Sequence, residues 1–156
     1  MPTQIEILQK FGDQAVKEMV TRLTNQGHVD TGRLRDSLAF IITKTADGVK
    51  ITFSAKDYAV YVDKGRKPGK FPPRLNIENW VKRKLKITEP SKLKQVTFLV
   101  RRKIALKGIA PSNFFSTTVS RKQPALAKEI AKIIGIEAQN TIIQEINNTK
   151  IKTITI

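Results

Sequence analysis

The side chains best suited to acid–base chemistry lie in the segment "NQGHVD". His28 is the only histidine of the chain, and the carboxylate of Asp30, two positions later, could orient its ring. A hydrolase would also need an activated nucleophile and donors for an oxyanion, and no motif in the sequence supplies them. One histidine and no cysteine do not make a zinc site. We therefore expect no enzymatic activity, no catalytic residue and no bound metal.

The aspartates and glycines indicate no other site for chemistry. Four aspartates at positions 30, 36, 57 and 63 have the right chemistry for a metal cluster, but each is better explained as a cap, a turn residue or the partner of a nearby arginine. Neither common form of the glycine-rich phosphate loop is present, so we expect no cofactor.

Positive charge is the most informative property of the sequence. The chain has 156 residues and a net charge of +16. Residues 63–122 contain seventeen Lys/Arg and three Asp/Glu, a balance of +14, whereas the segments on either side each balance to +1. Such a one-sided distribution indicates an anionic partner, either nucleic acid or an acidic protein surface. A basic face that is simply solvated is the alternative without a partner.

Two parts of this segment concentrate the charge. The stretch "KGRKPGKFPPR", residues 64–74, combines five basic residues with two glycines and three prolines. Residues 92–107 follow as a predicted helix with six more basic side chains, which could track a phosphate backbone or form the solvated side of that helix. The residues expected to face a partner or DNA are Arg66, Lys67, Lys70, Arg74, Arg101 and Arg102.

The periodicity of apolar residues predicts the elements of the N-terminal half. Apolar side chains recur every three to four residues over 3–24, which predicts an amphipathic helix. The segments "SLAFIITKT" and "VKITFSA" flank an Asp-Gly turn signal and predict a β-hairpin. The first of these strands is apolar on both faces, so we expect it to be covered on both. Residues 56–65 predict a short helix or turn that ends at Gly65.

The C-terminal half is predicted to be mostly helical. Pro72-Pro73 opens a helix that carries Trp80, and a further helix ends near Gly108. The segment "IAPSNFFSTTVS" reads as a loop whose two phenylalanines enter the core, and Pro124 opens a long last helix. We therefore expect one domain over residues 1–148, with an α+β fold in which a small, twisted antiparallel sheet is flanked by several helices. No apolar run approaches the roughly 20 residues that would cross a bilayer.

The last eight residues, "TKIKTITI" at positions 149–156, are strongly β-prone. A hydrophobic strand of this kind needs a sheet edge to pair with, on its own sheet or on a neighbouring subunit. The residues predicted to form this inter-subunit strand are Ile151, Ile154 and Ile156.

An ordered set of short motifs carries a resemblance to a known family. "DTGRLRDSL" at 30–38 precedes the hairpin, "YAVYVDKG" at 58–65 follows it, and "PP..NIENWVKRK" and "FLVRRKIALKGIAPSNFF" come at 72–84 and 98–115. In this order they resemble motifs of the tail-completion and head–tail connector proteins of tailed bacteriophages, over residues 30 to about 145. Two departures are Lys64 before the glycine and the tail after Asn148. The motif residues are Gly32, Arg33, Leu34, Ser37, Tyr58, Ala59, Tyr61, Gly65 and Trp80.

The resemblance implies a structural role in a virion. It implies an α+β subunit that forms a ring with copies of itself in the phage neck or at the tail end, with the portal, adaptor or tail proteins as partners and assembly in the host cytoplasm. Basic residues repeated around such a ring would face either packaged DNA in the channel or an acidic neighbouring ring. The rival hypothesis is a sequence-independent nucleic-acid-binding protein that uses the same basic segment.

Overall fold

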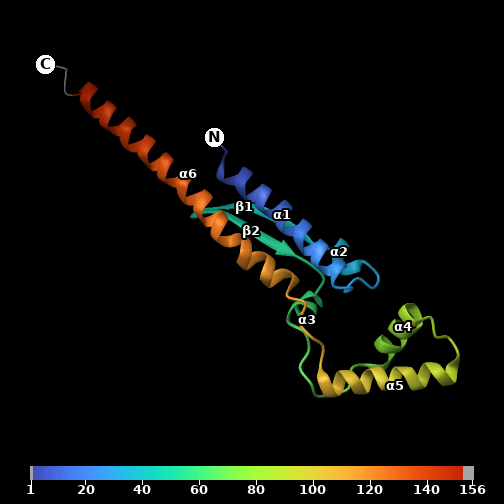
Figure 1. Ribbon diagram of the computed structural model, residues 1–156. Helices are drawn as coiled ribbons and strands as arrows, with labels where there is room; N and C mark the ends of the chain where they lie inside the picture. Colours follow the sequence, from blue (N-terminus) through green and yellow to red (C-terminus); the bar gives the residue numbers. More distant parts are fainter. Residues whose placement is uncertain (1, 153–156) are drawn as a thin grey trace.

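The computed structural model describes the backbone of residues 2–152 and the side chains of residues 2–145. Figure 1 shows an elongated molecule with two parts. The first, which we call the body, consists of residues 2–63 and 114–152. The second, which we call the arm, consists of residues 64–113 and projects from one end of the body. The elements in chain order are α1 (Gln4–Asn25), α2 (Arg33–Asp36), β1 (Ala39–Thr45), β2 (Gly48–Ser54), α3 (Ala59–Lys64), α4 (Arg74–Leu85), α5 (Pro90–Lys107) and α6 (Phe114–Lys152).

Helix α1 confirms the prediction from periodicity. Thr3 caps it with a capping box, in which the Thr3 side chain accepts from the Glu6 N–H and the Glu6 carboxylate accepts from the Thr3 N–H. The face predicted to be apolar is the one that is buried, with Ala15, Met19 and Leu23 almost completely inaccessible. This face packs along α6 and against the hairpin (Figure 1).

The hairpin is confirmed, but its first strand is covered on one face only. Strands β1 and β2 pair antiparallel with Phe40 opposite Phe53 and Ile42 opposite Ile51, and these four side chains lie on the half-buried face. Ile41 points the other way and is 63% exposed, so the prediction of a strand covered on both faces is wrong for the single chain. The reason is that a two-stranded sheet has only one helical layer, made by α1 and α6, to pack against.

The core of the body forms where α1, α2 and α6 meet. Leu34, Phe114 and three residues of α1 are buried together, with Leu38 and Phe53 packed against them as half-buried neighbours. Phe53 is surrounded by phenylalanine rings at centroid distances of 5.9 to 6.2 Å, in edge or tilted orientations. Phe114 therefore enters the core as predicted, whereas Phe115 contacts Phe53 but stays 37% exposed.

Helix α6 begins ten residues before the predicted start at Pro124. The cause is Asp63, a buried residue of α3 whose Oδ1 accepts the N–H groups of Phe115 and Ser116 at 2.8 and 3.2 Å. A carboxylate at this position satisfies donors that the first helical turn leaves unpaired, and its charge is favourable at the positive end of the helix. The segment "FFSTTVS" is therefore helical and not a loop, and Pro124 lies inside α6.

The C-terminal tail also differs from the prediction. Helix α6 continues to Lys152, so Thr149 to Lys152, including Ile151, are helical and do not form the predicted strand. A helix that is already established is extended one hydrogen bond at a time, which favours its continuation over local β propensity. Ile154 and Ile156 lie outside the described residues.

Replacing Asp63 by Ala should destabilise the body. The substitution leaves two N–H groups at the start of α6 without their acceptor, which costs about 1–3 kcal/mol of unfolding free energy. Urea denaturation followed by circular dichroism at a fixed protein concentration measures the change. Asp57→Ala, at an exposed aspartate of the same segment, is the matched control and should change stability by less than about 0.5 kcal/mol. Equal stabilities of the two variants would contradict the capping role of Asp63.

Glu18 joins α1 to α6 electrostatically. Its carboxylate forms salt bridges with Arg22, Arg121 and Lys122 at 3.1, 3.6 and 3.3 Å. Burial acts to raise the pKa of Glu18, but the hydrogen bonds from Arg22 and Lys122 outweigh it, so the pKa lies below the ordinary value of 4.5.

The lowered pKa predicts a pH-dependent effect of Glu18→Gln. A carboxyl group whose pKa is lower in the folded state stabilises the fold above its unfolded pKa, and this contribution is lost as the pH falls through the folded pKa. The variant should therefore be less stable than the wild type at pH 7, by at most about 1 kcal/mol, and the difference should shrink as the pH falls below about 4.5. Urea titrations from pH 7 to pH 3 measure it. A difference that does not change with pH would show that Glu18 acts through packing and not through charge.

Candidate partner-binding arm

The arm is built from two helices that pack on each other. Val81 of α4 and Leu93 of α5 are buried, and Trp80 of α4 is half-buried. Thr97 is also buried there, and its hydroxyl has no hydrogen-bond partner among the described atoms. A buried hydroxyl without a hydrogen-bond partner lowers the stability of the small core between α4 and α5.

Two crossing segments connect the arm to the body. Arg66 and Ile109 exchange both backbone hydrogen bonds, at 2.9 and 2.8 Å, and form an isolated antiparallel bridge. Gly65 and Gly108 flank this bridge with φ angles of 73° and 72°, where residues with a side chain are strained. A Cβ atom on Gly108 would also collide with the carbonyl oxygen of Arg66, so the crossing requires glycine.

The basic loop between α3 and α4 is fixed against α5. The Gly69 N–H donates to the Ala105 carbonyl at 2.8 Å, and the Arg101 Nε donates to the Pro72 carbonyl at 2.9 Å. Arg66 also turns inward and donates to the Lys70 carbonyl at 2.8 Å. Two of the residues predicted to face a partner, Arg66 and Arg101, thus hold the loop in place through hydrogen bonds to its backbone.

The remaining predicted partner-facing residues are exposed on the arm. Lys67, Lys70 and Arg102 lie at the surface and form no salt bridge within the described part of the chain. Arg74 is exposed too, and it pairs with Glu78 at 3.4 Å on the next turn of α4. Of the six predicted residues, two therefore bind the loop backbone and four are exposed to solvent, and their contact with a partner stays a prediction.

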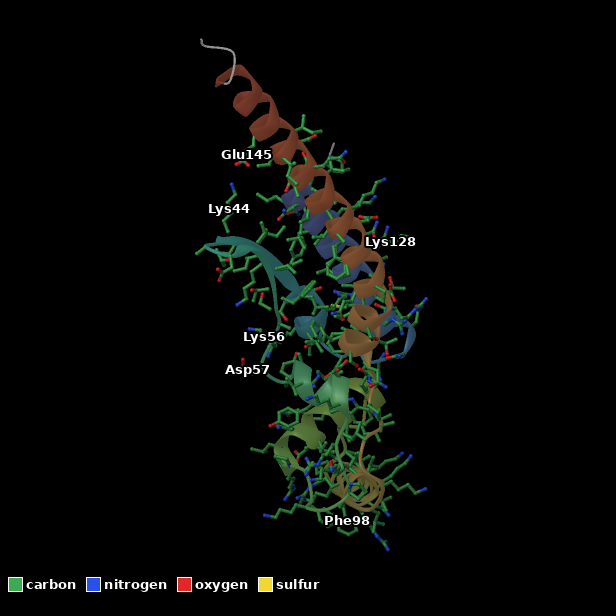
Figure 2. All side chains as sticks on the ribbon, turned by 90° about the vertical axis from the view of Figure 1, so that its left-hand side faces the viewer. Lys44, Lys56, Asp57, Phe98, Lys128 and Glu145 are labelled. Carbon is green, nitrogen blue, oxygen red and sulfur yellow. The ribbon has the colours of Figure 1, made fainter. Side chains whose placement is uncertain are left out.

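An aromatic pair that was not among the predicted partner-facing residues lies exposed on the arm. The rings of Phe71 and Phe98 stack with their centroids 6.2 Å apart, although the residues are 46% and 52% exposed. The guanidinium carbon of Arg101 lies 5.2 Å from the centroid of Phe71, in a cation–π contact. Phe98 lies at the opposite end of the molecule from Glu145 (Figure 2). The spacing of Phe98 and Arg101, three residues apart, places them on one face of α5, but no local signal in the sequence brings Phe71 to that face.

The division into body and arm is also a division of charge. Residues 64–113 contain fifteen lysines and arginines against two glutamates, a balance of +13, whereas residues 1–63 are neutral. Salt bridges in the structure engage only three of these fifteen: Arg74, Lys82 and Arg83. The arm therefore presents most of the net charge of the chain to solvent, together with the exposed phenylalanine pair.

The motif residues divide into structural and exposed ones. Leu34 is buried in the core, Ala59 packs against it, and Gly32 adopts a left-handed conformation at the start of α2. Ser37 donates to the Leu34 carbonyl and accepts the Lys56 N–H, which ties α2 to the end of the hairpin. Among the aspartates weighed as metal ligands, Asp36 pairs with Arg35, Asp30 pairs with Arg83 and Asp63 caps α6. The exposed motif residues are Arg33, Tyr58 and Tyr61.

Tyr58 and Tyr61 carry apolar rings with polar tips, which suit either the edge of a core or an interface. They are 44% and 72% exposed, so neither ring is part of the core of the single chain.

Comparison with protein-family models, with curated proteins and with solved structures finds no match to this chain. In the described part of the chain, no three histidine, aspartate or glutamate side chains come close enough to share a metal ion. None of the helices, as far as they are described, has the length and apolar character needed to cross a bilayer.

Replacing Gly108 by Ala should disturb the orientation of the arm without unfolding the body. The new Cβ would collide with the Arg66 carbonyl and strain a positive φ angle, which costs of order 1–3 kcal/mol at the crossing. Double electron–electron resonance between spin labels on cysteines introduced at Lys50 and Lys94 measures the distance from body to arm. We expect a broader or shifted distance distribution.

Gly135→Ala in α6 is the matched control, because a Cβ atom there meets open space. It should leave the distribution unchanged. An unchanged distribution in Gly108→Ala as well would show that the crossing does not set the orientation of the arm.

Proposed function

We propose that this protein is a structural subunit of a bacteriophage virion, a ring-forming head–tail connector or tail-completion protein that joins the portal or neck to the tail. The ordered motifs support the proposal, as does an α+β body that carries a projecting arm. The observation that carries it is the arm surface: stacked, half-exposed Phe71 and Phe98 lie within a segment of net charge +13, and twelve of its fifteen basic side chains form no salt bridge with a described residue. Exposed aromatic and arginine side chains of this kind are typical of protein interfaces.

The body offers surfaces for copies of itself. The two-stranded sheet leaves both outer edges unpaired within the described residues, and Ile41 is exposed on its open face. On α3, Val60 and Tyr61 are 56% and 72% exposed. The start of α1 lies beside Glu137, where Gln4 donates to its carboxylate, so α6 extends beyond α1 and exposes Ile142 and Ile143 (Figure 1). A ring of subunits would cover such surfaces.

The arm is proposed to dock on the next ring of the virion. Lys67 and Lys70 would meet carboxylates of that ring, and the phenylalanine pair would fill an apolar site at the centre of the contact. The fixed backbone of the loop reduces the conformational entropy that docking would cost.

The second candidate function is sequence-independent binding of nucleic acid. The same phenylalanine pair, with Arg101 over the ring of Phe71 and within a strongly basic segment, has the composition of a platform on which unpaired bases stack. Binding of this kind would show a steep loss of affinity as salt concentration rises.

Reversing the charge of Lys67 and Lys70 tests the leading proposal. The double variant Lys67→Glu, Lys70→Glu should yield at least about tenfold fewer complete particles, because like charges brought together at a contact cost several kcal/mol. Electron microscopy of lysates counts complete particles and tailless heads, and circular dichroism confirms that the variant folds.

The matched control reverses two exposed lysines of the body, Lys44→Glu with Lys128→Glu, which Figure 2 places away from the arm. It changes the net charge equally and should leave particle numbers close to the wild type. Normal numbers of complete particles in the arm variant would reject the docking role. Loss of binding to single-stranded DNA with unaffected particles would favour the second candidate.

A further inference from the structure

A cleft of about 700 Å³ lies where the arm meets the body. Four parts of the chain line it: Leu23 of α1, the segment from His28 to Arg35, the residues Tyr58 and Val62 of the α3 region, and one side of α4. Two of the sequence motifs, "DTGRLRDSL" and "YAVYVDKG", thus meet at one cavity although the hairpin separates them in the sequence.

The floor of the cleft is apolar. Leu23 and Leu34 are buried core residues whose side chains also line the cavity, and Val29 and Val62 are half-buried beside them. The ring of Tyr58 forms one wall and is 44% exposed. An apolar floor of this kind gains free energy when it is covered by an apolar side chain of a ligand.

The rim is basic. Arg33, Arg35 and Arg83 line the cleft, and Asp30 is the one acid in its lining. Asp30 is already paired with Arg83, whose Nε lies 3.4 Å from Asp30 Oδ1, and Arg35 is paired with Asp36. Arg33 forms no salt bridge with any described residue and is exposed. The lining of the cleft therefore combines apolar side chains with one arginine, Arg33, that has no salt-bridge partner among the described residues.

Two amides complete the rim on the side of α4. Asn76 and Asn79 line the cleft, and neither side-chain amide has a hydrogen-bond partner among the described residues. An amide side chain donates and accepts at once, so it can bind the N–H and C=O groups of a peptide backbone.

We propose that this cleft binds an acidic segment of a partner protein, with a carboxylate on Arg33, an apolar side chain on the floor between Leu34 and Tyr58, and the peptide backbone on Asn76 and Asn79. Charge complementarity identifies the occupant as acidic, and the apolar floor with its amide rim favours a peptide over a nucleic acid. Arginine suits this role because its planar guanidinium can bind a carboxylate with two parallel hydrogen bonds.

A peptide bound in the cleft would also fix the arm on the body. Within the described residues, α4 reaches the body through Arg83 on Asp30 and through Lys84, whose Nζ donates to the Val29 carbonyl at 2.8 Å. These contacts are exposed, and exposed ion pairs contribute little. A segment that contacts both Arg33 of the body and Asn79 of α4 would add a bridge across the cleft. The inference goes beyond the proposed virion role and holds whether or not the chain forms a ring.

NMR titration of the ¹⁵N-labelled protein tests the proposal. The probe is a short peptide in which glutamates alternate with leucines, and the comparison probes are the same peptide with glutamine for glutamate and a short oligothymidylate. We expect the acidic peptide to shift the amide signals of His28, Arg33, Tyr58 and Asn79, and the glutamine peptide to bind at least about tenfold more weakly. Acidic-peptide shifts confined to the arm would overturn the proposal, as would equal binding of the oligothymidylate in the cleft.

Charge-matched variants separate the cleft from the rest of the basic surface. Arg33→Glu should lower the affinity for the acidic peptide by at least about tenfold. Lys67→Glu on the arm makes the same change in net charge and should lower this affinity by less than about threefold. The amide spectrum of each variant reports whether it folds. Asn79→Leu removes the amide without changing charge and should also weaken binding. If Arg33→Glu and Lys67→Glu have equal effects, the peptide responds only to net charge and the cleft is not its site.

Discussion

The cap that Asp63 places on α6 is the interaction on which the rest of the structure depends. Its side chain accepts two N–H groups of α6, its backbone carbonyl accepts the Asn113 N–H, and the preceding Val62 carbonyl accepts from both the backbone and the hydroxyl of Ser112. These bonds hold the end of α3 and the start of α6 together although about fifty residues separate them in the sequence. Residues 64–113 lie between these two joined segments, so they must leave the body and return to it, and they form the arm.

This topology places the main hydrophobic core and the excess of positive charge in different parts of the molecule. The body is built from the hairpin and the helices α1, α2, α3 and α6 around a core that includes Phe114, and its residues 1–63 carry no net charge. The arm carries the excess of positive charge on a small core of its own. Repulsion among these charges acts mainly within the arm, where a partner of opposite charge would relieve it. If the same charged residues were spread evenly along the chain, residues 1–63 would not be neutral and the arm would not be strongly basic.

The crossing at Arg66 and Ile109 decides how these two parts can cooperate. Glycines at 65 and 108 allow the two segments to approach within backbone hydrogen-bonding distance, and the loop then packs on α5. The same arrangement brings α4 over the segment from His28 to Arg35 and creates the cleft. The proposed partner recognition by the arm and peptide recognition in the cleft would therefore both depend on this crossing.

The sequence by itself determined the features that depend on residues close together in the chain. These are α1, the hairpin with its Asp-Gly turn, the two helices of the arm, the α+β class and the position of the charge. Only the tertiary structure decided where α6 begins, because Asp63 lies some fifty residues before the N–H groups that it caps. It also decided that β1 is covered on one face, that Arg66 and Arg101 bind the loop backbone, and that residues 149–152 extend a helix. The pairing of Phe71 with Phe98 and the meeting of two motifs at the cleft arise between segments that are distant in sequence. Residue spacing determines which side chains share a face of one helix or strand. Contacts between elements depend on how these elements pack in the tertiary structure.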